Sequence, residues 1–277
     1  MAVYPELVIP TAKTFVRLLV ACILLSVTLA AAAQARFSTP QAATDAFVDA
    51  IATGDDDALA RVLGADYKAR IPQHDYQDEI PSFLGAWSRQ HQVITDDSGR
   101  AWLEVGATHW RLPIPVVQSG GGWRFDTAAG AAEMRKRQLG RNELGAIETL
   151  RLLHGAQQAY LQRQGNYAQR LVSRSGAHDG LYWPSQDGSD ASPLGADALA
   201  MTPDTPADAS YFGYRFKIMP ASGTSGFSII AWPAVHGVTG IHTFMVSEDA
   251  VIRQSSAQTA AQAVKIPWSE WRPLDEQ

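Results

Sequence analysis

The sequence predicts an α+β fold, in which helices and antiparallel strands occur twice in the same order. Apolar residues recur at helical spacing ahead of each group of strands, as at Ala43, Phe47 and Ile51. The strands are marked most clearly where apolar and charged residues alternate between Tyr214 and Ile218. Helices followed by an antiparallel meander are typical of α+β proteins.

The first residues predict export. Lys13 and Arg17 precede an apolar stretch over residues 18–29, and small residues follow as far as Ala35. This is the order of a secretory signal peptide, and the stretch is shorter than the roughly 20 residues that span a membrane. We expect residues 1–33 to be a signal peptide, cleaved after Ala33 or Ala35, and the mature protein to be periplasmic or otherwise extracytoplasmic, without a membrane span. An uncleaved N-terminal anchor is the alternative.

The single cysteine, Cys22, lies inside the apolar stretch. Residues 19–22 have the form of a lipoprotein cleavage box, but the apolar stretch continues well beyond the cysteine. We therefore expect Cys22 to be discarded with the signal peptide. The mature chain then has neither a disulfide nor a thiol nucleophile.

Composition and motifs exclude several classes of function. The chain has a net charge of −5, and its basic residues gather only at Arg135-Lys136-Arg137, so we expect no nucleic-acid partner. The seven histidines show no metal-ligand spacing. Phosphate-cradling glycine loops and nucleophile elbows are also absent from the sequence. We predict neither a metal nor a cofactor.

The first predicted domain covers residues 37–126. Thr39 followed by Pro40 predicts the start of a helix that Gly54 ends, and Asp56 or Asp57 is expected to cap a second, short helix. A further helix is expected over 83–91. Strands are predicted over 101–105, 110–117 and 123–125, with glycines between them. This order resembles the nuclear transport factor 2-like fold, in which helices pack into a curved sheet.

A helical connector is predicted over residues 127–145, and a second domain over 146–266. Asn142 is expected to be the N-cap of a new helix, whose apolar face carries Leu150, Leu153 and Tyr160 and which Gly165 ends. Strands are expected over 214–218, 227–232, 239–246 and 251–254. The plan resembles the globular domain of a type IV pilin, as do Ala156-Gln157-x-x-Tyr160 and Gly165-Asn166-Tyr167-Ala168. The chain lacks the glycine of a prepilin cleavage site, so we do not expect a fibre subunit.

Six different motifs follow one another along most of the chain. They are Gly122-Trp123-Arg124-Phe125-Asp126-Thr127, Gly140-Arg141-Asn142-Glu143-Leu144, Asp179-Gly180-Leu181-Tyr182-Trp183-Pro184, Ser192-Pro193-Leu194-Gly195, Ala231-Trp232-Pro233 and Gly237-Val238-Thr239-Gly240-Ile241-x-Thr243-Phe244. Over residues 37–266 the chain thereby resembles the domain of unknown function 2950 family of uncharacterised exported bacterial proteins. The resemblance implies export and the two-part architecture, and it implies no reaction and no site. The hairpin at 222–226 and the region 70–90 depart from the family pattern.

Two stretches carry the candidate binding residues. His178 and Asp179, with Tyr182 and Trp183 close by, suit a general-base site or a site that grips a sugar or peptide. The alternative is a turn at Asp179-Gly180, with Tyr182 and Trp183 covering the core. Arg141 and Asn142 suit either ligand binding or a helix cap with an ion pair at a domain interface. No catalytic residue is assigned.

These observations favour a non-enzymatic binding or structural module of the cell envelope. One alternative is a hydrolase-like enzyme that uses His178 and Asp179. Another is an accessory subunit of an envelope complex. The partner is expected to be another envelope protein or a small ligand, and the oligomeric state is left open.

Overall fold

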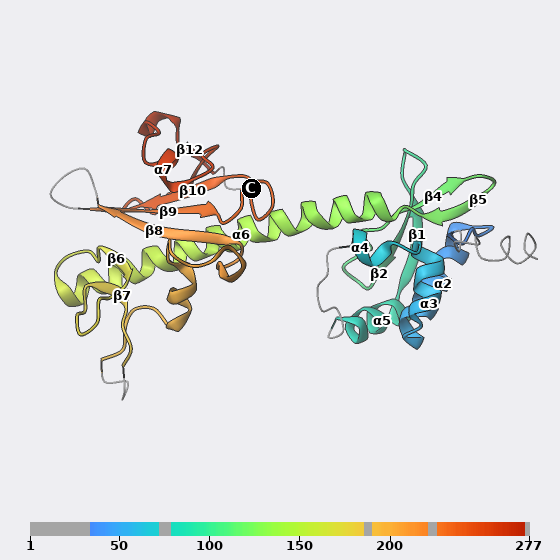
Figure 1. The fold of residues 1–277 in the computed structure, drawn as a ribbon, viewed down its shortest axis with the longest axis horizontal. Coiled ribbons are helices and arrows are strands. Elements are labelled where there is room, and N and C mark those ends of the chain that lie inside the picture. The colour runs from blue at the N-terminus through green and yellow to red at the C-terminus, as the bar shows by residue number, and fades with distance from the viewer. Residues whose placement is uncertain (1–33, 72–78, 186–189, 221–225, 275–277) are drawn as a thin grey trace, which may run out of the picture. The chain divides into compact units, whose positions relative to one another are not determined.

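The computed structural model describes residues 34–71, 79–185, 190–220 and 226–274, which form helices and antiparallel sheets, so the α+β prediction is confirmed (Figure 1). Contacts divide the chain into two compact units, the first ending at Met134 and the second beginning at Arg135. The predicted signal peptide, Cys22 and most of the 222–226 hairpin lie outside the described residues.

Helices open the first unit. They are α2 (Pro40–Thr53), α3 (Asp56–Leu63), α4 (Tyr67–Arg70) and α5 (Ile80–Arg89). Thr39 caps α2 as predicted, because its Oγ1 accepts a hydrogen bond from the N–H of Ala42 at 3.1 Å. The cap predicted for α3 is wrong by one residue. Asp55 takes that place and accepts from the N–H of Ala58 at 2.9 Å.

The sheet of the first unit is antiparallel and follows the order β1-β2-β4-β5, with β3 paired to β2. Its strands are β1 (His91–Thr95), β2 (Ala101–Val105), β3 (Trp110–Arg111), β4 (Val116–Ser119) and β5 (Gly122–Phe125). The strand predicted over 110–117 is two strands, and β1 was not predicted. Phe47 and Phe125 are buried and their ring centroids lie 5.3 Å apart, whereas Ile51 and Trp102 are only half-buried.

The N-terminal end of the described chain is bound to this core. The side-chain amide of Gln34 donates to the carbonyl oxygens of Val62 at 3.0 Å and Phe125 at 2.8 Å. Its Oε1 accepts from Arg124 at 3.1 Å. Three residues later, Phe37 exchanges backbone hydrogen bonds of 2.8 Å with Trp123. The segment 34–37 is therefore part of the folded unit.

A single helix, α6 (Thr127–Gln164), replaces the predicted connector and the predicted first helix of the second domain. The prediction that a helix begins at Asn142 is wrong. The surrounding residues are mostly good helix formers, and each internal glycine costs only about 1 kcal/mol relative to alanine. Asn142 does not act as the N-cap of a new helix, because its side chain finds a hydrogen-bond partner in a neighbouring loop.

The second unit packs α6 against an antiparallel sheet with the order β12-β11-β10-β9-β8. Its strands are β8 (Tyr214–Pro220), β9 (Phe227–Pro233), β10 (Thr243–Ser247), β11 (Arg253–Ser255) and β12 (Arg272–Pro273). Six large residues of this core are at most 5% exposed. They are Leu150, Leu153, Tyr160, Tyr214, Phe216 and Phe244.

Short elements complete the second unit. They are the parallel pair β6 (Arg170–Val172) and β7 (Gly180–Tyr182), the 3-10 turns η1 (Ala196–Met201), η2 (Ala207–Ala209) and η3 (Trp268–Glu270), and the helix α7 (Ala260–Ala263). Neither β12 nor the β6–β7 pair was predicted, because a strand of two or three residues is too short to reveal an alternating pattern. No helix in the described part of the chain combines the length and apolarity that crossing a membrane requires.

Candidate functional site

The predicted candidates His178, Asp179, Tyr182 and Trp183 lie on and beside β7. The imidazole of His178 stacks on the indole of Trp183, with ring centroids 4.5 Å apart and planes 18° apart. Its Nε2 lies 3.3 Å from a carboxylate oxygen of Asp190. Trp183 is buried and donates from Nε1 to the backbone oxygen of Asp190 at 2.8 Å. His178 thus pairs with Asp190, twelve residues away in sequence.

Asp179 faces a different set of groups. Its carboxylate accepts from the N–H of Arg174 at 2.9 Å and from the same residue's Nε at 2.7 Å, and it lies 3.4 Å from Nε of Arg170. These bonds, led by the backbone N–H of Arg174, lower the pKa of Asp179 below its ordinary value. The carboxylate is committed to closing the 173–180 turn, so this geometry favours the turn interpretation over a general-base pair.

A second polar cluster joins α6 to the loop between β9 and β10, and we call it the latch. Glu143 Oε1 accepts hydrogen bonds from the backbone N–H groups of Ile241 at 2.9 Å and His242 at 3.1 Å. The same oxygen lies 3.2 Å from Nδ1 of His242. Asn142, which is buried, donates to the carbonyl oxygen of Thr239 at 2.9 Å and accepts from Gln138 at 2.7 Å. Two adjacent residues of α6 therefore hold the whole 239–242 turn.

The start of β8 completes the latch from the other side. Tyr214 is fully buried and its hydroxyl donates to the carbonyl oxygen of His242 at 2.8 Å. Burial, with a smaller contribution from the Glu143 carboxylate, raises the pKa of this phenol far above its ordinary value, so it stays a neutral donor. Gly240 lies so close to the phenol that an added Cβ would come within 2.1 Å of its oxygen. Only glycine fits there.

Of the two candidates on α6, one belongs to the latch and the other does not. Asn142 was predicted as a helix cap and is instead a mid-helix side chain that binds the 239–242 turn. Arg141 is exposed, and the partner that its guanidinium finds among the described residues is the Gln138 amide, at 2.7 Å, rather than a carboxylate.

The latch residues Glu143, Tyr214, Thr239 and His242 were not predicted as site residues. A signal was available, since Asn142-Glu143 and Thr239-Gly240-Ile241 belong to two of the six motifs that carry the family resemblance. Pairing motifs that are nearly a hundred residues apart requires knowledge of the tertiary structure, which spacing within one motif does not supply.

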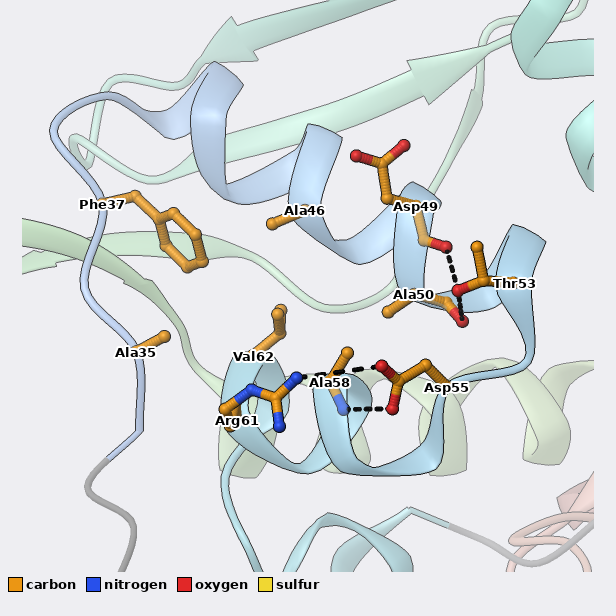
Figure 2. Close-up of a pocket in the computed structure, with 10 residues that line it drawn as sticks. All are labelled: Ala35, Phe37, Ala46, Asp49, Ala50, Thr53, Asp55, Ala58, Arg61 and Val62. Carbon is orange, nitrogen blue, oxygen red and sulfur yellow. Dashed lines mark hydrogen bonds and ion pairs between the residues drawn. The ribbon is translucent and has the colours of Figure 1, made fainter.

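The first unit carries a hollow of about 400 Å³ between α2, α3 and the segment 35–37 (Figure 2). Alanines 35, 46, 50 and 58 line it together with Phe37 and Val62. Of its charged side chains, Asp55 caps α3 and lies 3.8 Å from the guanidinium of Arg61, and Asp49 is exposed to solvent. The hollow therefore offers mainly apolar contact area.

Within the residues that the structure describes, no three histidine, cysteine, aspartate or glutamate side chains converge in a way that would hold a metal ion. The ionisable groups of the latch and of the His178 stretch instead form ion pairs and hydrogen bonds to backbone groups of turns.

Comparison with known proteins gives one assignment. No curated protein and no solved structure matches the chain significantly. The family model of a protein of unknown function, DUF2950, matches residues 34–273 and so covers nearly all of the described structure. The match includes both units, the latch and the His178 stretch, and on this ground the chain belongs to the DUF2950 family.

Proposed function

We propose that this protein is an exported, non-enzymatic binding module of the cell envelope, and that it binds a protein partner through the surface around the latch. The observation that carries the proposal is a set of large apolar side chains left exposed beside the latch. They are Leu144, Phe212, Val235, Val238 and Ile241, each between 43% and 67% exposed, and we call them the apolar border.

The contacts of the latch place these residues in one region of the second unit. Leu144 follows Glu143, which binds the N–H of Ile241. Val238 precedes Thr239, whose carbonyl oxygen accepts from Asn142, while the N–H of Val235 donates to Thr239 Oγ1 at 3.1 Å. Exposed apolar residues scattered singly need no explanation, but a cluster on a rigid support is typical of an interaction surface.

Phe212 gives the border its most unusual member. Its φ is 49°, in the left-handed region, where a bulky residue is strained, and its ring is 53% exposed. Its ring packs against Gly145, where an added Cβ would come within 2.8 Å. Strain of this kind costs on the order of 1–3 kcal/mol and persists where the surroundings impose it, which occurs most often at functional sites.

The chemistry of the border favours a protein partner. An aromatic ring and aliphatic side chains surround a polar centre whose hydrogen bonds are already made within the latch. Aromatic side chains such as the Phe212 ring are enriched at protein–protein interfaces. A partner with an exposed apolar segment would cover the border without disturbing the latch.

Site-specific photocrosslinking in the native envelope tests the proposal. A photoreactive benzoylphenylalanine in place of Val238 and, separately, of Leu144 should capture the same protein, and Phe212→Ala should abolish both products. The matched control is the same probe in place of Leu199, which is 54% exposed on η1. Different products from the two border positions, or equal capture from position 199, would refute the proposal.

Export has its own test. The order of charge, apolar stretch and small residues over 13–35 supports a cleaved signal peptide. Mass spectrometry of the mature protein should find an N-terminus at Gln34 or Arg36. A lipid-modified N-terminus at Cys22, or an intact N-terminal segment, would exclude this version.

The finer fold relationships are also proposals. A long helix packed on an antiparallel sheet supports the resemblance of the second unit to a type IV pilin globular domain. Helices followed by the β1-β2-β4-β5 sheet support the nuclear transport factor 2-like resemblance of the first unit. An experimental structure of each unit, compared strand by strand with those folds, would decide both.

A further inference from the structure

The outer edge of the first unit's sheet is an unprotected β-strand. Within the described residues β1 pairs with β2 alone, which places it at the end of the sheet. Its sequence, His91-Gln92-Val93-Ile94-Thr95, contains no proline and no lysine, and its register with β2 runs without a bulge. Natural edge strands usually carry a proline, a lysine or a bulge, because an edge strand without them can pair with other chains.

The alternation of hydrogen bonds along β1 shows which of its backbone groups are left unpaired at the edge of the sheet. Gly106 donates to the carbonyl oxygen of Gln90 at 2.8 Å, and Asp96 donates to that of Arg100 at 2.9 Å. In an antiparallel pair, residues bond to the partner strand at every second position. Gln92 and Ile94 therefore bond to β2, and the N–H and C=O groups of His91, Val93 and Thr95 point away from the sheet.

We propose that β1 pairs with β1 of a second copy of this chain, antiparallel and about a two-fold axis at Val93. In this register Val93 lies opposite the partner's Val93, and His91 lies opposite the partner's Thr95. All three outward-facing residues then meet outward-facing residues, with two hydrogen bonds for each pair. The contact is self-complementary, as a two-fold interface must be.

Charges at the two ends of β1 select this register. Arg89 is the last residue of α5, and Asp97 lies in the turn between β1 and β2. Both are exposed, and neither forms an ion pair with another described residue. In this register Arg89, at the end of α5, and the partner's Asp97, in the turn after β1, come to the same end of the contact. The two-fold axis repeats this pair at the other end of the contact. Opposite charges that meet at both ends favour this register over one shifted by two residues.

Light scattering coupled to size-exclusion chromatography tests the pairing on the purified protein. The wild type should have twice the mass of one chain. Val93→Pro should give a monomer with an unchanged far-ultraviolet circular dichroism spectrum, since proline removes an outward N–H and is tolerated at sheet edges. A monomeric wild type at high concentration would overturn the proposal, even if the edge bound an unrelated peptide.

A charge swap keeps the test decisive if Val93→Pro does not fold. Arg89→Asp and Asp97→Arg should each weaken dimerisation at least about tenfold, because like charges then face each other at both ends. The double variant should restore the dimer. Asp204→Arg, at an exposed position of the second unit, is the control and should leave the dimer intact. Dimers that survive both single reversals, or a double variant that stays monomeric, would overturn the proposed register.

Discussion

At the scale of single residues, Glu143 holds more of the second unit together than its sequence context indicates. One carboxylate oxygen accepts from two successive backbone N–H groups, and the same side chain reaches the imidazole of His242. Each of those N–H groups would lose its partner if the carboxylate were removed. Leaving a partly buried donor such as the N–H of His242 unsatisfied costs more than the net value of the bond itself.

We therefore predict that Glu143→Ala lowers the free energy of unfolding by about 1–3 kcal/mol. The control is Glu148→Ala on the same helix, whose carboxylate pairs only with the exposed Arg151. It should change stability by less than about 0.5 kcal/mol. Urea unfolding of both variants measures the difference, and equal effects would contradict the structural role of the latch.

Asp96 predicts an acid-sensitive turn in the first unit. Its carboxylate accepts from the hydroxyl and N–H of Ser98, from the N–H of Arg100 and from the indole of Trp102 at 2.8 Å. These bonds, led by the Ser98 hydroxyl, lower the pKa of Asp96 well below its ordinary value. A carboxyl whose pKa is lowered in the native state stabilises the fold at pH values above its unfolded-state pKa of about 3.9. This stabilisation is lost as the pH falls through the native-state pKa.

Asp96→Asn should accordingly destabilise the protein at neutral pH, and the difference from the wild type should shrink as the pH falls below about 4. Unfolding free energies measured from neutral to acid pH provide the comparison. Asp204→Asn, at an exposed position in the second unit, should cause no such pH-dependent difference. A destabilisation of Asp96→Asn that stays constant with pH would show that charge is not the cause.

At the scale of elements, α6 contains glycines with opposite requirements. A Cβ built on Gly140 meets nothing within 4 Å, whereas one on Gly145 would come within 2.8 Å of the Phe212 ring. Both lie inside a continuous helix. Gly140 therefore only lowers the stability of the helix through its backbone entropy. Gly145, in contrast, leaves room for Phe212, the strained aromatic residue of the apolar border.

Gly140→Ala is predicted to stabilise the protein by about 0.5–1 kcal/mol, because alanine loses less conformational freedom in a helix. Gly145→Ala should destabilise it by about 1–3 kcal/mol through overpacking against Phe212. Gly145→Ala combined with Phe212→Ala should recover part of that loss. Thermal unfolding of the three variants is sufficient, and a destabilising Gly140→Ala would mean that α6 is not helical at that position.

The same helix shows what sequence patterns could and could not predict. Apolar spacing correctly identified the faces of α2 and of the second half of α6, since burial of one face requires it. It did not reveal that α6 continues through residues 140–145, because the polar Asn142 looked like a cap and is satisfied from a distant loop. Residues adjacent in sequence, such as His178 and Asp179, found separate partners, which no local pattern encodes.

At the scale of the whole molecule, the chain builds separate hydrophobic cores. The core of the first unit includes Phe47 and Phe125, and the main core of the second includes Tyr214, Phe216 and Phe244. The clusters share no residue. Each core therefore has its own apolar surface to bury, and damage to one is expected to remain local.

Phe125→Ala should cost the first unit about 3–5 kcal/mol, and Phe216→Ala should cost the second unit a similar amount. Amide hydrogen exchange followed by mass spectrometry reports the two separately. Protection should fall in β2 and β4 for the first variant, and in β9 and β10 for the second. Loss of protection throughout the chain in either case would show that the two units unfold together.

The hydrogen bonds of Gln34 have a consequence for maturation. A peptidase that cuts after Ala33 leaves all three of these bonds in place, whereas one that cuts after Ala35 discards the glutamine that makes them. The longer product would keep the hydrogen bonds by which Gln34 links α3 to β5, and the shorter product would lack them. If the chain is exported as proposed, Gln34 is both the first residue after the Ala33 cleavage site and a structural residue. Two-residue heterogeneity at the mature terminus would then produce two populations that differ in resistance to heat.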